Sequence, residues 1–367
     1  MVLPPPTRRA LFLFPTDTMG GAENVLQLSA HAALHSGAFD EITCFVLCRP
    51  PSGALDALAA DTRVKIIHSG ATSEKAGLPA LARVLRDGRW DFVMSSHTHL
   101  NAAASLARRF GWLKTKRLVT RESTMIFERQ FSGRGRIAPY LYHAYGGQDL
   151  LVCQSQRMAA SLAQHTGDRF AAMTKVIENP LDMDALEQAI VASRNGPRTE
   201  NRCKIVWCGR LAEVKSPDRA VKTVQALETL APGRFHLTMI GDGPMRDTLS
   251  MQVSQASLES TVTFTGRVAS PAPIMAQCDL GLLTSDVEGY PNVIPEMLAC
   301  GVRRVVTTNC AGGLDALPGV VVSAETTPAT LAQHLLEASS AKDASEDVLE
   351  VLIARRPERF LERLLAA

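Results

Sequence analysis

The sequence of 367 residues predicts an α/β protein made of two consecutive doubly wound parallel sheets, each with helices on both faces. Short apolar runs that suit buried strands alternate with amphipathic helical stretches along the chain. The alternation is interrupted once, by a polar stretch from Asn195 to Asn201 that contains Gly and Pro. The length also suits two domains better than a single core. We therefore expect two domains that face each other across a cleft.

In the first half, the expected strands are short runs rich in Leu, Val, Ile and Phe. They occupy residues 10–14, 42–47, 64–68, 92–95, 118–120 and 150–153, and an amphipathic helix over 22–36 follows the first of them. A further helix over 183–193 leads into the polar stretch. We predict an N-terminal domain over residues 1–184, and a helix end and linker over 185–202.

After the linker the alternation starts again, which predicts a C-terminal domain over residues 203–344. The expected strands are 204–208, 236–240, 262–264, 280–283 and 304–308, with helices over 217–227, 245–256 and 292–300. Residues 345–367 are helical in pattern but are broken at Pro357. We expect this last segment to pack back on the N-terminal domain.

Composition limits the class of protein. Hydrophobic residues make up 46% of the chain and charged residues 21%, with a formal net charge of +2, as in a globular enzyme with no global attraction for nucleic acid. None of the eight cysteines forms a CxxC pair or a Cys/His ligand cluster, so buried free thiols in a reducing cytoplasm are expected. No stretch approaches the roughly 20 apolar residues that span a bilayer. Any membrane contact should therefore be peripheral.

The most informative stretch runs from Glu288 to Glu296 and reads EGYPNVIPE. It places one carboxylate in a loop and the second on the helix that follows. Eight helical steps would separate the two by about 12 Å, so they are not expected to share a metal ion or a proton. That separation resembles the distance between the ribose and the sugar ring of a nucleoside diphosphate sugar. We expect the two carboxylates to hold the ends of such an elongated ligand.

Groups that suit a diphosphate follow the first predicted strand of each domain. Arg210 and Lys215 come after the first strand of the second domain, where two cations can neutralise a diphosphate and the charge that develops on it. Gly20 and Gly21 join the first strand to the first helix, whose free N–H groups suit phosphate. Taken singly, a solvated cation or a tight turn would explain each of these as well.

Two further motifs follow strands of the second domain. Gly241-Asp242-Gly243 opens a helix, but Arg246 stands where a dinucleotide-binding fingerprint needs its third glycine, which disfavours a nicotinamide enzyme. Arg267 either lines a base pocket or lies in an ordinary turn.

In order and spacing, these motifs resemble those of family-4 retaining glycosyltransferases with the GT-B fold. The resemblance covers nearly the whole chain. It is carried by Gly20-Gly21-Ala22-Glu23, Asn179-Pro180-Leu181-Asp182, Gly209-Arg210-Leu211 with Lys215, Gly241-Asp242-Gly243-Pro244, and Glu288 with Glu296. The chain departs from the family pattern at Met297-Leu298, where Ala-Met is commoner, and at Pro295, which stands inside the helix just before the second Glu.

The resemblance implies a role for each matched residue. Glu296 would hydrogen-bond the ribose hydroxyls, Glu288 would reach the donor sugar, and both cations would hold the diphosphate. Backbone N–H groups near Gly21, Asn292 and Val293 would complete the cradle. The expected donor-binding residues are Gly20, Gly21, Arg210, Lys215, Gly241, Arg267, Glu288, Gly289, Asn292, Val293 and Glu296. The expected catalytic residues are His97, Glu288, Arg210 and Lys215.

His97 lies in Ser96-His97-Thr98-His99, where the family often has a histidine near the donor sugar. We expect it to donate a hydrogen bond to the sugar or its phosphate. The HxH pattern could also suggest a metal, but no third ligand is apparent and GT-B enzymes generally work without one. Arg121 and Glu122 are candidates for acceptor contact, with a surface ion pair as the alternative.

The implied activity is that of a cytoplasmic, metal-independent hexosyltransferase in surface polysaccharide or glycoconjugate synthesis. It would move a hexose from a nucleoside diphosphate to a glycan or lipid-linked acceptor, with retention at the anomeric carbon. The donor is expected to be a UDP-sugar, with a GDP-sugar as the alternative, and no cofactor is expected. Because no carboxylate nucleophile is apparent, the resemblance implies a same-face displacement in which the leaving phosphate helps to deprotonate the acceptor.

Two other interpretations stay open. One is a sugar-nucleotide epimerase or a phosphorylase on the same architecture. The other is a non-catalytic sugar-nucleotide-binding or assembly protein, although the set of Glu288, Glu296, Arg210 and Lys215 argues against it.

Residues 108–136 combine nine basic side chains with two acidic and four aromatic ones. Such a segment could rest on an anionic membrane at the inner face, each basic residue contributing on the order of 1 kcal/mol. A solvated basic loop is the alternative. No nucleic-acid-binding motif accompanies the segment.

Overall fold

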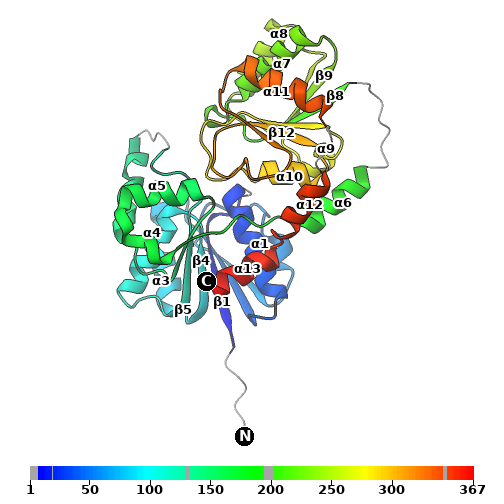
Figure 1. Cartoon of the computed structure of the whole chain (residues 1–367). Coiled ribbons are helices and arrows are strands. Elements are labelled where there is room, and N and C mark those ends of the chain that lie inside the picture. The colour runs from blue at the N-terminus through cyan, green and yellow to red at the C-terminus, as the bar shows by residue number, and fades with distance from the viewer. Residues whose placement is uncertain (1–6, 19, 129–132, 194–201, 342–344) are drawn as a thin grey trace. The chain divides into compact units, whose positions relative to one another are not determined.

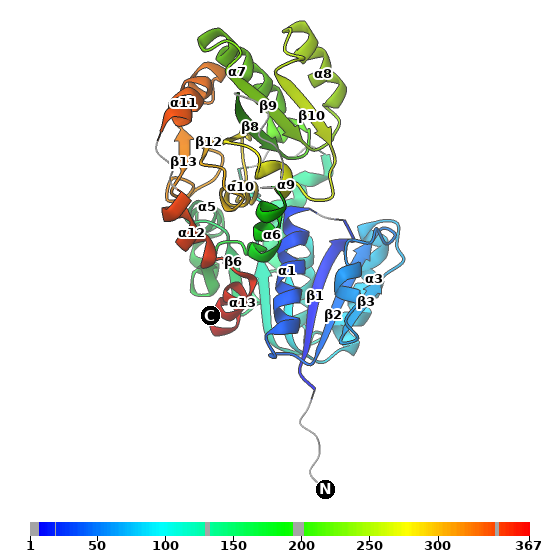
Figure 2. The same ribbon diagram turned by 90° about the vertical axis from the view of Figure 1, so that its right-hand side faces the viewer.

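The computed structural model describes the chain except for residues 1–6, 19, 129–132, 194–201 and 342–344. It forms two compact units (Figures 1 and 2). The N-terminal unit comprises residues 1–180 and 355–367, and the C-terminal unit residues 181–354. The predicted breaker-rich linker, residues 195–201, lies outside the described residues.

The described part of the N-terminal unit contains a parallel sheet of seven strands in the order β3-β2-β1-β4-β5-β6-β7. The strands are β1 (Arg9–Thr16), β2 (Glu41–Cys48), β3 (Val64–His68), β4 (Trp90–Ser95), β5 (Thr115–Arg121), β6 (Leu150–Cys153) and β7 (Thr174–Val176). The helices are α1 (Gly21–His35), α2 (Asp56–Ala59), α3 (Glu74–Asp87), α4 (Thr98–Arg109), α5 (Gln156–Thr166) and α13 (Pro357–Ala366), with 3-10 helices η1 (Gly133–Ala144) and η2 (Gly167–Met173).

The C-terminal unit contains a second parallel sheet, of six strands in its described part, in the order β10-β9-β8-β11-β12-β13. The strands are β8 (Cys203–Cys208), β9 (Phe235–Ile240), β10 (Val262–Gly266), β11 (Leu280–Leu283), β12 (Arg304–Thr308) and β13 (Val320–Ser323). The helices are α6 (Met183–Ser193), α7 (Pro217–Leu230), α8 (Arg246–Gln255), α9 (Ala272–Met275), α10 (Val293–Ala299), α11 (Pro328–Ser340) and α12 (Ser345–Ile353), with the 3-10 helix η3 (Glu213–Lys215). Two doubly wound sheets confirm the predicted fold class.

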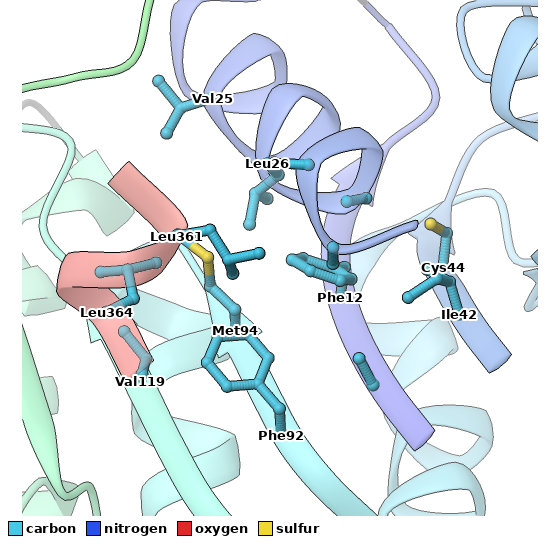
Figure 3. Packing of buried hydrophobic residues seen from close by; sticks show 14 of the residues in the cluster. Phe12, Val25, Leu26, Ile42, Cys44, Phe92, Met94, Val119, Leu361 and Leu364 are labelled. Atoms are coloured by element: carbon cyan, nitrogen blue, oxygen red, sulfur yellow. The ribbon is translucent and has the colours of Figure 1, made fainter. Parts of the chain in front are cut away.

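Strand β1 lies in the interior of the sheet, which explains the apolar run in its sequence. Side chains of a strand alternate between the two faces of the sheet. Phe12 therefore packs in one core with Leu26 of α1, Phe92 of β4 and Leu361 of α13 (Figure 3). Leu11 packs in the separate core on the opposite face. Because helices cover both faces, both sets of positions must be apolar.

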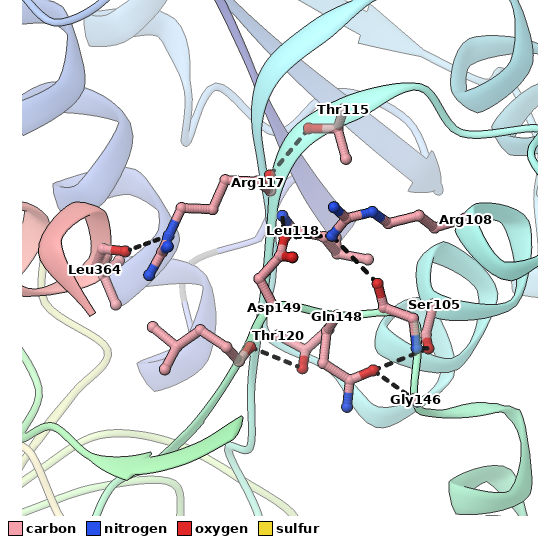
Figure 4. Close-up of polar contacts among 12 residues, drawn as sticks. Ser105, Arg108, Thr115, Arg117, Leu118, Thr120, Gly146, Gln148, Asp149 and Leu364 are labelled. Atoms are coloured by element: carbon pink, nitrogen blue, oxygen red, sulfur yellow. Dashed lines mark hydrogen bonds and ion pairs between the residues drawn. The ribbon is translucent and has the colours of Figure 1, made fainter. Parts of the chain in front are cut away.

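The C-terminal segment divides between the two units. Helix α12 packs against α10 in the C-terminal unit, whereas α13 packs against α1 in the N-terminal unit. Polar contacts hold α13 in place: Arg117 Nε donates to the Leu364 carbonyl at 2.7 Å (Figure 4), and Arg363 Nη1 pairs with Glu178 at 2.8 Å. The return to the N-terminal unit, expected from residue 345, thus begins at Arg355.

Candidate functional site

Two loops at the carboxyl edge of the C-terminal sheet are joined along their backbones. The loop after β8 donates from Gly209 N to Ile240 O and from Leu211 N to Asp242 O, both at 3.0 Å. Gly241 has φ +130°, and a Cβ there would lie 1.9 Å from the Gly209 carbonyl oxygen. Only glycine fits this approach. The loop that carries Arg210 is therefore positioned by the loop after β9.

Lys215 and Glu288 form an ion pair at this edge. The Lys215 Nζ contacts Glu288 Oε1, which also accepts a hydrogen bond from Ser285 Oγ at 2.7 Å. The two charged side chains retain 28% and 14% of their exposure, so both are shielded but still reachable by a ligand. The predicted diphosphate cation and the predicted sugar-binding carboxylate are thus neighbours.

A polar network that the sequence motifs do not predict supports this pair. Thr284 Oγ1 donates to the Lys215 carbonyl at 3.0 Å and accepts from the buried Trp207 Nε1 at 2.9 Å. Arg219 Nη1 donates to the Thr284 carbonyl at 2.6 Å and its Nη2 pairs with Asp286 at 2.8 Å. The sequence signal that could have shown this network is the polar Thr-Ser-Asp run that ends the apolar strand β11.

Glu296 lies on α10 and is half-buried. Within the described residues its carboxylate has neither a cation nor a hydrogen-bond partner, and burial raises its pKa to about 7. Cys208, at the end of β8, shows that Glu296 lies at the same edge. Burial of the Cys208 thiol and the nearby charge of Glu296 raise the pKa of Cys208 to about 12, while the nearby charge of Lys215 opposes that shift. Glu296 is thus a carboxylate without a partner, close to the Lys215–Glu288 pair.

The other predicted donor residues differ in their exposure. Arg210 and Arg267 are exposed, and in the described part of the chain neither guanidinium has a partner. Gly289 is buried, and Asn292 and Val293 are half-buried at the start of α10.

In the N-terminal unit, Gly20, Gly21 and His97 lie at the carboxyl ends of β1 and β4. These two strands are neighbours, and the chain order of the sheet reverses between them. Such a switch point is where doubly wound sheets bind ligands. His97 Nε2 lies 3.4 Å from Glu23 Oε1, and the two side chains keep 22% and 16% of their exposure. No cluster of three metal-ligating side chains occurs among the residues that the structure describes.

The burial of Arg121 and Glu122 contradicts the predicted acceptor contact. It also contradicts the alternative of a surface ion pair. Each is 1% exposed. Arg121 donates to Asn179 Oδ1 at 2.6 and 3.1 Å, and burial lowers its pKa to about 9. Glu122 accepts hydrogen bonds from the hydroxyls of Tyr145 and Tyr142 at 2.7 and 2.9 Å, and burial raises its pKa. Both are core residues of this unit.

The basic segment 108–136 contains cations of two kinds. Figure 4 shows both Arg108 and Arg117. Arg108 donates to the Gly147 carbonyl at 3.2 Å and to Asp149, and Arg117 donates to the Leu364 carbonyl. By contrast, Phe110 and Trp112 are 65% and 55% exposed, and Lys114 is exposed beside them. Residues 129–132 lie outside the described part. No helix of the described residues is long and apolar enough to cross a membrane.

Comparison with solved structures supports the same architecture. The chain superimposes on Anabaena Alr3699/HepE in complex with UDP and glucose with a TM-score of 0.78, at 19% identity, covering 97% of this chain and 98% of that one. The lipopolysaccharide outer core galactosyltransferase WaaB gives a TM-score of 0.71 at 15% identity, covering 98% of both chains. The fold is GT-B.

The sequence comparison then gives the family. Residues 202–340 match the model of the glycosyl transferases group 1. A Campylobacter jejuni GalNAc-α-(1->4)-GalNAc-α-(1->3)-diNAcBac-PP-undecaprenol α-1,4-N-acetyl-D-galactosaminyltransferase is 24% identical over 236 residues, 64% of this chain and 60% of that protein. A Mycobacterium tuberculosis GDP-mannose-dependent α-(1-6)-phosphatidylinositol dimannoside mannosyltransferase is 28% identical over 167 residues, 44% and 42% of the two chains. The chain therefore spans less than two thirds of these relatives. Residues 202–340 thus match the group 1 glycosyltransferases, which confirms the resemblance found in the motifs.

Proposed function

We propose that the protein transfers a hexose from a UDP-hexose to a glycan or lipid-linked acceptor in surface polysaccharide or glycoconjugate synthesis. The observation that carries the proposal is the joint placement of the Lys215–Glu288 pair and the unpartnered Glu296 at one sheet edge. A solved neighbour holds UDP and glucose, and relatives act on undecaprenol- and phosphatidylinositol-linked glycans. A GDP-hexose is the alternative donor.

In the proposed reaction the acceptor oxygen forms a bond to the anomeric carbon while the bond from that carbon to the diphosphate oxygen breaks. The acceptor proton passes to the leaving phosphate on the same face, so that configuration is retained. Arg210 and Lys215 stabilise the negative charge that develops on the diphosphate, which needs no metal ion. Glu288 binds the sugar and Glu296 the ribose hydroxyls. His97 is assigned a hydrogen bond to the sugar or its phosphate.

Donor affinity is expected to rise with pH through the titration of Glu296. Ribose hydroxyls donate to an ionised carboxylate, and below about pH 7 this group is protonated in the ligand-free protein. Between about pH 6 and about pH 8 the affinity for UDP-glucose, measured by calorimetry, should increase roughly tenfold. The diphosphate of this donor is esterified at both ends and stays ionised throughout. Glu296→Gln should bind more weakly and without this pH dependence.

The stability of the free protein should change in the opposite sense. Because the pKa of Glu296 is raised above its usual 4.5, the folded state holds the extra proton between the two values, and stability decreases as pH rises through that window.

A Glu296→Gln variant with unchanged affinity for UDP-glucose at about pH 8 would contradict the ribose assignment. The same would follow if affinity in the wild type fell with rising pH.

The proposal includes peripheral contact with an anionic membrane. The exposed rings of Phe110 and Trp112 lie with their centroids 6.1 Å apart just after α4, and the exposed Lys114 follows them in the sequence. Aromatic side chains favour the interfacial region, and basic ones the surface potential of anionic lipids. Such contact would bring the enzyme to a lipid-linked acceptor at the cytoplasmic face.

Substitution of Lys114 or Trp112 should weaken binding to anionic vesicles. Lys114→Ala is expected to lower the affinity for phosphatidylglycerol vesicles about fivefold at low salt, from about 1 kcal/mol per basic residue, and less at high salt. Trp112→Ser should lower it further. Co-sedimentation measures both, with Lys175→Ala, an exposed cation of β7, as the control. Equal sedimentation of all four proteins, or no preference over phosphatidylcholine, would favour a solvated basic loop.

A further inference from the structure

Glu23 is the polar side chain that anchors His97. Its carboxylate Oε1 lies 3.4 Å from His97 Nε2. The other ring nitrogen, Nδ1, is shielded from solvent and has no hydrogen-bond partner in the described part of the chain. Within that part, Glu23 is therefore the one polar side chain that holds the imidazole. The contact joins α1 to the residue before α4, and these elements follow the neighbouring strands β1 and β4.

The local backbone fixes the position of the Glu23 carboxylate. Glu23 lies in the first turn of α1 and accepts a hydrogen bond from its own backbone N–H. Negative charge is favoured at a helix start. The side chain folds back over Gly20, where an added Cβ would lie 2.5 Å from Glu23 Oε2. The absence of a side chain at Gly20 thus makes the space that the carboxylate occupies.

The charges around the pair favour an ionised Glu23. Burial alone would raise the pKa of Glu23, but the hydrogen bond and charge of His97 lower it below its usual value, and the buried Arg121 adds to this effect. His99 lies 6.0 Å from His97 between ring centres, and its own acidic neighbour is Glu74, at 4.0 Å. The two histidines of the HxH pattern thus face different carboxylates.

We propose that Glu23 is a positioning residue of the glycosyl transfer, which fixes the imidazole of His97 in the orientation that the donor requires. The inference rests on the proposed function, in which His97 acts on the donor sugar or its phosphate. It assigns the acidic residue of the Gly-Gly-Ala-Glu motif a part in the reaction, in addition to its favourable place at the helix start. In this role Glu23 acts on the donor through the His97 imidazole.

The test is a double-mutant cycle of Glu23 and His97 in the full chain. Glu23→Gln should lower kcat about tenfold or more and leave the KM for the donor and the Tm nearly unchanged. In a His97→Ala background the same substitution should have no further effect on kcat, because the group that it positions is gone. Glu74→Gln, which removes the carboxylate beside His99, is the matched control and should retain the wild-type kcat.

Three outcomes would overturn the inference. They are an unchanged kcat in Glu23→Gln, a loss of kcat fully explained by a lower Tm, and independent effects of the two substitutions. A wild-type protein that transfers no sugar from any nucleotide donor would instead refute the proposed function itself. If Glu23→Gln does not fold, Glu23→Asp, which keeps the charge but shortens the side chain, provides the same cycle and should give an intermediate kcat.

Discussion

Replacing Lys215 with alanine should reduce sugar transfer by about a hundredfold or more. The substitution removes one of the two cations assigned to the diphosphate, and loss of one electrostatic group at a developing oxyanion typically costs about 100-fold to 1,000-fold in rate. It also leaves Glu288, whose side chain is 14% exposed, without its cation and next to the anionic donor. The measurement is kcat/KM with a UDP-hexose and a lipid-linked acceptor.

Lys222→Ala is the control for Lys215→Ala. Lys222 also carries an ion pair, with Asp218 at 3.0 Å, but lies exposed on α7. An exposed pair contributes little, so its removal should change kcat/KM less than about twofold. Should Lys215→Ala retain activity comparable to Lys222→Ala, the assignment of the diphosphate to this edge would be wrong. Circular dichroism of both variants separates a loss of chemistry from a loss of fold.

Gly241→Ala should destabilise the C-terminal unit and abolish donor binding. The new Cβ would lie 1.9 Å from the Gly209 carbonyl oxygen, a backbone atom that cannot turn aside as a side chain could. The loops after β8 and β9 must then separate, breaking the hydrogen bonds that position Arg210. We expect a loss of unfolding free energy of about 3 kcal/mol or more, measured by urea denaturation.

Gly233→Ala is the control for Gly241→Ala. It introduces the strain of a positive φ without a steric clash. Gly233, with φ +68°, also has a left-handed conformation, but no atom lies within 4 Å of the site of its Cβ. Its replacement should cost only the conformational strain of about 1 to 2 kcal/mol. Equal losses in the two variants would show that the close approach of the two loops does not govern stability.

The strand and helix alternation could be predicted because it depends on local apolar runs. Strand β7, with the sequence Thr-Lys-Val and one exposed and two half-buried residues, carries no such run and was not predicted. The pairing of Lys215 with Glu288 depends on two segments 73 residues apart. Sequence spacing identified both residues as ligands of one donor, but it could not show that they contact each other in the free protein.

Burial of charge was the feature least accessible from the sequence. Arg121 stands in a Thr-Arg-Glu run that resembles a surface turn, yet Ser96 and Asn179, which follow other strands, enclose its guanidinium. For the same reason, the number of basic residues in segment 108–136 could not distinguish Arg117, bonded to α13, from the exposed Lys114. Only the fold shows which cations are free to meet a partner.

The division of the C-terminal segment has a consequence for how the chain folds during synthesis. The N-terminal unit is discontinuous: Phe360, Leu361 and Leu364 of α13 complete the core that begins with β1 and α1. A nascent chain that has emerged only as far as Pro180 therefore lacks the α13 side chains that pack against α1. This core is completed only after the entire C-terminal unit and α13 have left the ribosome, so the domain that is translated first is completed last.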